Sequence, residues 1–136
     1  MRLRSLAVAA LVALAAPASA VLNMNEGLWE TALTADGRTQ PVGVKCYTRD
    51  DIAEMERLLQ GETTRIDGVC RYSDFTRAGD TVHYTMTCRW GNDDQVSAVE
   101  ATYRGDSADG TIRWGGVTVT ASSRRIGPCS RSSFER

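Results

Sequence analysis

The sequence predicts a mainly β fold: an antiparallel meander forming a strongly curved sheet or small barrel, with one short helix at about 49–60. Three observations predict it. Apolar and polar residues alternate over short runs, tight-turn pairs such as Asp36-Gly37 and Gly115-Gly116 separate those runs, and only one segment has helical spacing. Short strands joined by tight turns are typical of an antiparallel meander. A strongly curved or closed sheet buries the apolar faces and limits open edges. A sandwich of two sheets is the alternative.

Residues 1–20 have the pattern of a secretory signal peptide that is cleaved after Ala20. Two arginines precede an apolar run at 6–16, and the segment ends in an Ala-Ser-Ala cleavage pattern. The run is too short to span a membrane, and a buried N-terminal helix is the alternative. We therefore expect residues 21–136 to form one exported, periplasmic domain.

The net charge of the mature chain indicates which classes of partner to expect. The chain has 16 basic and 17 acidic residues, and removal of Arg2 and Arg4 with the leader leaves a net charge of −3. A mildly acidic surface of mixed sign argues against nucleic acid and against an anionic membrane surface as main partners. No apolar run after the leader is long enough to cross a bilayer, so we expect no membrane span in the mature chain.

A strand is expected at 27–34, followed by a second strand that ends at Cys46-Tyr47, and Asp36-Gly37 between them is a strong hairpin signal. Pairing about this turn sets three pairs opposite each other: Leu33 and Gln40, Thr31 and Val42, and Trp29 and Val44. One face then carries Trp29, Leu33, Val42, Val44 and Cys46. Alternation of this kind predicts a sheet with one dry face.

One helix is expected after this hairpin. Thr48 is a good N-cap, and Asp50 and Asp51 lie in the first turn, where the helix dipole favours anions. Apolar residues follow at helical spacing until Gly61 ends the helix. We expect its apolar stripe to lie against the sheet or to close one end of it.

The central hairpin, residues 70–88, turns about Gly79. This register sets Cys70 opposite Cys88, Tyr72 opposite Met86 and Thr76 opposite Val82. Opposed cross-strand Cβ atoms are close enough for a disulfide. Four cysteines allow three pairings, and the hairpin favours Cys70–Cys88, which leaves Cys46–Cys129. A zinc site competes with this interpretation, but no two cysteines lie at a zinc-knuckle spacing.

The last part of the chain is expected to hold a strand at 95–104, a longer loop at 105–110, and a hairpin of 111–114 with 117–120. The Gly115-Gly116 turn sets Ile112 opposite Val119 and Trp114 opposite Val117, again on one face.

Four local features together resemble a known family. They are Gly27-Leu28-Trp29-Glu30 after a signal peptide, Cys46 before a short acidic helix, the Cys70/Cys88 hairpin, and the closing 124–129 segment, Arg-Arg-Ile-Gly-Pro-Cys. Over residues 26–129 the chain is similar to the bacterial domain-of-unknown-function 3617 family. The resemblance implies an exported bacterial protein. It brings no established activity, ligand or catalytic residue.

The aromatic residues offer a candidate binding site. Alternation places five of them on inward faces: Trp29, Tyr84, Trp90, Tyr103 and Trp114. Such a set lines an apolar pocket or fills the core of a small domain, and the sequence leaves both interpretations open.

The search for catalytic chemistry starts with His83, the one histidine, which the register places opposite Phe75 on the face away from Tyr84. Asp74 shares the register of the inner face or lies merely close to the turn. Carboxylates at Asp93-Asp94 and in the 105–110 loop could serve a hydrolase, but the loop lacks the ligand pattern of a calcium loop. We identify no catalytic residue, metal ligand or cofactor site.

These observations together favour a non-catalytic module that binds a small apolar ligand or an envelope protein. One alternative is an envelope structural or stress-related protein that acts through its surface. A more distant alternative is the carboxylate-based hydrolase.

Overall fold

The computed structural model describes residues 21–61 and 70–130. The predicted signal peptide at 1–20 lies outside these residues, as does most of the predicted loop at 61–68. Seven strands and one helix occur in the described residues: β1 (Gly27–Ala35), β2 (Arg38–Tyr47), α1 (Arg49–Leu59), β3 (Cys70–Ala78), β4 (Thr81–Trp90), β5 (Asp93–Tyr103), β6 (Ser107–Trp114) and β7 (Val117–Gly127). Within this part of the chain no helix is long and apolar enough to cross a membrane.

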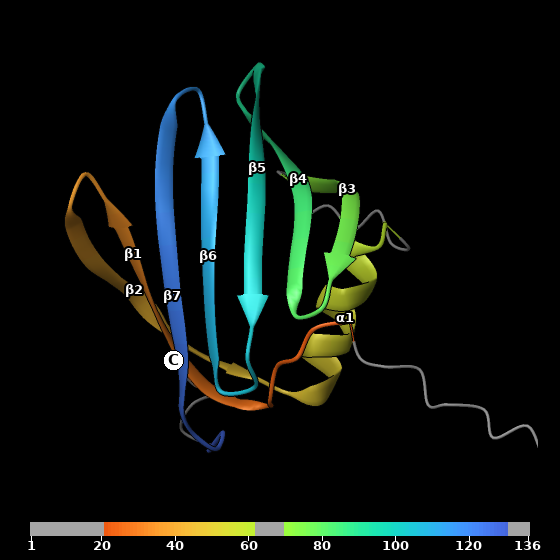
Figure 1. Ribbon diagram of the computed structural model, residues 1–136, viewed down its shortest axis with the longest axis vertical. Helices are drawn as coiled ribbons and strands as arrows, with labels where there is room; N and C mark the ends of the chain where they lie inside the picture. The colour runs from red at the N-terminus through yellow and green to blue at the C-terminus, as the bar shows by residue number, and fades with distance from the viewer. Residues whose placement is uncertain (1–20, 62–69, 131–136) are drawn as a thin grey trace, which may run out of the picture.

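The strands form a single antiparallel sheet in the order β2-β1-β7-β6-β5-β4-β3 (Figure 1). Neighbours in the sheet are also neighbours along the chain, with the exception of β1 and β7. The sheet is curled but open, and β2 and β3 are its two edges. The predicted mainly β, antiparallel, curved sheet with one short helix is confirmed. The alternative of two packed sheets is wrong, because all the strands in the described residues belong to one sheet.

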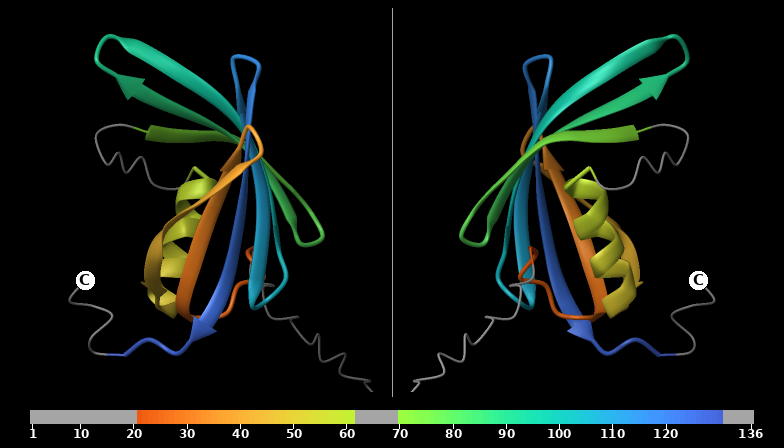
Figure 2. Two further views of the ribbon diagram at one scale, coloured as in Figure 1. Left: turned by 90° about the vertical axis from the view of Figure 1, so that its left-hand side faces the viewer. Right: turned by 90° about the vertical axis from the view of Figure 1, so that its right-hand side faces the viewer.

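Helix α1 begins at a capping box. The Thr48 hydroxyl accepts a hydrogen bond from the Asp51 amide (3.2 Å), and the Asp51 carboxylate accepts one from the Thr48 amide (2.8 Å). The bond from the Thr48 amide, together with one that the Thr48 hydroxyl donates to the same carboxylate at 2.9 Å, lowers the pKa of Asp51. The helix contacts both edge strands, β2 and β3, and lies on one side of the sheet (Figure 2). We call this side the inner face.

The core lies between α1 and the inner face. Its centre is a cluster of Leu22, Leu59 and Val82, and Val82 is fully buried. Leu22 precedes β1, and its amide donates to the Glu56 carboxylate of α1 at 3.0 Å. The segment before β1 is therefore held against the helix, which lies against the inner face of the sheet, one of the two placements expected from the sequence.

The β1–β2 register differs from the predicted one beyond the turn. Leu33 lies opposite Gln40 as expected, but a bulge at Val42 sets Thr31 opposite Gly43 and Trp29 opposite Lys45. A one-residue shift moves every following side chain to the other face of a strand. Val42 and Val44 are consequently 60% and 58% exposed instead of buried.

The β3–β4 hairpin pairs Cys70 with Cys88 and Tyr72 with Met86 as predicted, but Thr76 lies opposite His83 and not Val82. The turn contains two residues, Gly79 and Asp80, and a bulge at Asp74, whose φ is +56°, restores the register farther along. Asp74 is exposed at this bulge and does not belong to the inner face.

Two disulfides join Cys46 to Cys129 and Cys70 to Cys88. This is the pairing that the hairpin register favoured. The first ties the end of β2 to the segment after β7, and the second joins β3 to β4. Each disulfide therefore anchors an edge strand covalently. An edge strand is hydrogen-bonded to only one neighbouring strand.

The predicted 105–110 loop is largely wrong, because β6 already begins at Ser107. Side chains alternate here, with Ala108 buried and Asp109 exposed, and polar residues on the outer face obscured the strand. Gly110 follows on the inner face, where an added Cβ would lie 2.9 Å from the carbonyl oxygen of Glu100. The pairs Ile112–Val119 and Trp114–Val117 occur as predicted.

Candidate ligand-binding site

A pocket of about 190 Å³ lies between the inner face and α1. Its walls come from strands β1, β4, β5, β6 and β7, from the end of β2, from α1 and from the segment before β1. The residues that line it are mostly apolar or aromatic: Met24, Trp29, Thr31, Tyr47, Met55, Tyr84, Val99, Ala101, Tyr103, Ala108, Ile112, Ala121 and Ser123, with Gly110. The polar residues Asp109 and Thr111 complete the lining. We refer to this space as the inner-face pocket.

Small residues explain why the pocket is open. Ala108 and Gly110 of β6 and Ala121 of β7 line it side by side, since Gly110 pairs directly with Ala121. Protein interiors are close-packed, so three neighbouring positions with one methyl group or none leave space that larger side chains would fill. The aromatic residues stand around this floor and do not fill it.

Two half-buried tyrosines, Tyr84 and Tyr103, form one wall of the inner-face pocket, and Tyr72 packs behind Tyr84 outside the lining. Tyr72 and Tyr84 make an edge-to-face contact, with ring centroids 5.7 Å apart. Burial, with a smaller contribution from neighbouring tyrosines, raises the pKa of both Tyr84 and Tyr103 above the usual value. At neutral pH their phenols are uncharged, so this wall offers hydroxyl groups and ring surface, not an anionic base.

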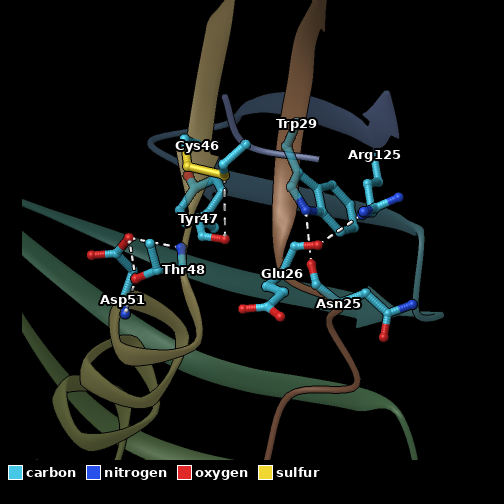
Figure 3. The surroundings of a disulfide bond; sticks show 9 residues. Asn25, Glu26, Trp29, Cys46, Tyr47, Thr48, Asp51 and Arg125 are labelled. Carbon is cyan, nitrogen blue, oxygen red and sulfur yellow. Dashed lines mark hydrogen bonds between the residues drawn. A yellow bond between two sulfur atoms is a disulfide. The ribbon is translucent and has the colours of Figure 1, made fainter. Parts of the chain in front are cut away.

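The first and last strands meet beside this pocket, at the β1–β7 pair (Figure 3). The indole nitrogen of Trp29 donates to the carbonyl of Asn25 at 3.0 Å, and Arg125 Nε donates to the carbonyl of Glu26 at 2.7 Å. Next to them, the guanidinium of Arg124 pairs with the Glu30 carboxylate across the outer face. The Gly-Leu-Trp-Glu segment and the closing Arg-Arg segment are therefore one structural unit, although they lie almost 100 residues apart.

A scan against protein-family models matches residues 24–129 to DUF3617, described as a protein of unknown function. The chain belongs to the DUF3617 family. The DUF3617 match begins at Met24 and ends at Cys129, so it includes both chain ends of the unit in Figure 3. Comparisons with curated proteins and with solved structures gave no significant match.

Gly27, which lies within the DUF3617 match, provides a test of this unit. Its φ is +147°, and an added Cβ would lie 2.6 Å from the carbonyl oxygen of Gly127 and against the Arg125 side chain. Gly43 has nearly the same φ, +150°, but open space around it. We expect Gly27→Ala to lower the free energy of unfolding by about 3 kcal/mol and Gly43→Ala by about 1 kcal/mol, because only Gly27 adds a backbone clash to the strain.

Urea denaturation of the two variants measures this difference. Equal losses at both glycines would show that backbone strain alone matters and that the close approach to β7 does not.

Three of the five aromatic residues predicted to line a pocket do so in this DUF3617 domain: Trp29, Tyr84 and Tyr103. The other two do not. Trp90 is 63% exposed, because it ends β4 in the part of the β4–β5 hairpin that extends away from α1 (Figure 2). Trp114 is half-buried beside the Gly115-Gly116 turn and lies outside the lining.

The sequence prediction missed Met24, Tyr47 and Met55 as lining residues. Met55 was detectable in principle from its place on the apolar stripe of the helix. Tyr47 and Met24 carried no such signal, because each lies at an element end, where alternation does not define a face.

The carboxylates considered for hydrolysis are separated by the fold. Asp93 and Asp94 begin β5, whereas Asp106 and Asp109 follow its other end, so roughly 30 Å of strand lies between the two groups. Asp109 instead pairs with Arg104 at 2.6 Å, and Asp106 accepts from Asn25 at 2.8 Å.

His83 lies on the outer face, with its Nε2 2.8 Å from the Glu100 carboxylate. This face is separated from the inner-face pocket by the sheet itself. Across residues 21–61 and 70–130, no group of three or more His, Cys, Asp or Glu residues could hold a metal ion.

Proposed function

We propose that this DUF3617 protein is an exported, non-catalytic binding protein that holds a small apolar ligand in the inner-face pocket. The observation that carries the proposal is the pocket of about 190 Å³ between α1 and the sheet, with a wall of aromatic and methionine side chains. A dry apolar cavity of roughly 150 Å³ is enough to bind benzene. The inner-face pocket is therefore large enough for one ring or a short alkyl chain.

Binding without catalysis fits the groups that surround the pocket. An ordinary tyrosine is already protonated at neutral pH, and burial raises the pKa of Tyr84 and Tyr103 further. The one carboxylate of the lining, Asp109, is paired with Arg104, and the His83–Glu100 pair lies on the opposite face. General acid–base catalysis needs a titrating group within hydrogen-bond reach of the reacting atoms. The lining instead supplies apolar contact area, which is the typical composition of a binding pocket.

Export rests on the leader pattern of residues 1–20 and on the two disulfides. Disulfides persist in oxidising compartments such as the bacterial periplasm. A periplasmic location would give the protein access to small apolar molecules that enter through the outer membrane.

The test combines an apolar probe with a variant that fills the pocket. We expect 1-octanol at ten times its Kd to raise the Tm of the wild type by about 5 °C, because saturation at that level adds about 1.4 kcal/mol. Ala121→Phe places a ring in the pocket and should abolish this shift. Ala98→Phe, which adds the same ring at an exposed position on the outer face, should leave it unchanged.

Native mass spectrometry of the protein purified from its own host provides a second measurement. A bound small molecule that Ala121→Phe excludes would support the proposal. An octanol shift that persists in Ala121→Phe, or a wild type with neither a shift nor a co-purified molecule, would contradict it and favour a protein that acts through its surface.

A further inference from the structure

We propose, building on the function proposed above, that the ligand is a single-chain amphiphile with an anionic head. Its tail would occupy the inner-face pocket, and its head would lie in an adjoining polar cleft. This cleft has a volume of about 680 Å³, and its charged lining residues are Glu26, Arg49, Glu56, Asp106 and Arg125.

The pocket and the cleft meet at Met24, which lines both. Helix α1 forms part of each wall. Arg49, Ile52 and Glu56 recur at helical spacing along the cleft, while Met55 faces the pocket. An apolar space therefore opens beside a charged one, with a flexible methionine side chain between them. A molecule with one apolar end and one charged end fits this arrangement.

The cleft's three carboxylates already have partners. Glu26 lies 3.7 Å from Arg49 in an exposed ion pair. Glu56 accepts from the Leu22 amide at 3.0 Å, and Asp106 accepts from the Asn25 amide group at 2.8 Å. These two carboxylates therefore bind the segment before β1 and hold it in place. A cationic head would have to compete for these oxygens.

The guanidinium groups of Arg49 and Arg125 make fewer close contacts within the protein than these carboxylates do. Arg49 is 87% exposed, and its described ion pair is a long one, 3.7 Å from Glu26. Arg125 uses its Nε on the Glu26 carbonyl. Each guanidinium carries five N–H donors in a planar fork that matches a carboxylate. The donors of the cleft therefore favour an anionic head, and Arg49 is the residue best placed to bind it without disturbing the fold.

The size of the pocket limits the tail. A cavity of roughly 150 Å³ accommodates the six carbons of benzene. By the same proportion, about 190 Å³ accommodates on the order of eight carbons. Octanoate is the matching probe, because 1-octanol has the same chain length without the charge.

Calorimetric titration at pH 7.5 compares these two probes. We expect octanoate to bind the wild type at least fivefold more tightly than 1-octanol. Arg49→Gln should reduce this preference to less than twofold by weakening octanoate alone, with the Kd of 1-octanol unchanged. Arg113→Gln removes a charge of the same kind from an exposed position of β6 outside the cleft, and it should leave both affinities unchanged.

The possible results separate this inference from the proposed function. If 1-octanol binds and octanoate binds no more tightly, the anionic-head assignment is overturned while the apolar binding function stands. If neither probe binds, both proposals fail. If octanoate is preferred but Arg49→Gln and Arg113→Gln weaken it equally, the preference comes from overall charge, and the cleft is not the head site.

Discussion

Removal of the Cys46–Cys129 disulfide is expected to lower the free energy of unfolding by about 4–5 kcal/mol. The bridge closes a separation of 83 residues, and a cross-link that closes a longer loop removes more entropy from the unfolded chain. It also attaches edge strand β2 to the segment after β7. We expect a Cys46→Ala, Cys129→Ala variant to show this loss in urea denaturation without a free thiol to complicate refolding.

The second disulfide provides the matched comparison. Cys70–Cys88 closes a separation of 18 residues, for which the same relation gives roughly 3 kcal/mol. The Cys70→Ala, Cys88→Ala variant should therefore be the more stable of the two. The reverse order would show that local packing at buried Cys88, and not loop entropy, sets the contribution of each bridge.

The second large effect is expected at Trp29, whose replacement by alanine should cost about 4 kcal/mol. The side chain is only 2% exposed, lines the inner-face pocket and donates a hydrogen bond to the Asn25 carbonyl. Truncation enlarges an existing cavity and leaves that carbonyl without its donor. Thermal and urea denaturation measure the loss.

Two further variants separate the causes. Trp29→Phe keeps most of the apolar area but removes the indole N–H, and it should cost about 1–2 kcal/mol. Trp90→Ala, at a 63% exposed position, should change stability by less than about 0.5 kcal/mol. A similar loss at Trp29 and Trp90 would be inconsistent with the burial described above.

Local signals predicted most of the fold. The capping residues around Thr48 indicated the helix start, and glycine-containing turns indicated the hairpins. The central hairpin shows how a correct and an incorrect pairing can coexist. Its turn was predicted one residue out of register, so Thr76 was misplaced, but the bulge at Asp74 compensates by one residue. Cys70 and Cys88 therefore face each other in both registers.

Bulges account for the main errors in the predicted strand registers, because no local residue pattern indicates where a bulge occurs. Val42 lies in an alternating run that reads as continuous strand, yet it is an extra residue opposite β1. The binding site was predicted in part for a related reason. Alternation identifies which face a side chain occupies, as for Tyr84 and Tyr103, but not how far along the strand the helix extends over it. Trp90 lies on a strand whose end α1 does not reach.

The pairing of β1 with β7 has a consequence for how the domain forms. Each other strand pair joins consecutive strands, whereas Thr31 and Ser123 meet although they are 92 positions apart in the sequence. Local hairpins close quickly, and contacts of high sequence separation are slow because their loop entropy must be overcome first. We expect the β3–β7 meander to assemble early and the β1–β2 hairpin to dock last, so the domain completes its fold only after β7 has been synthesised.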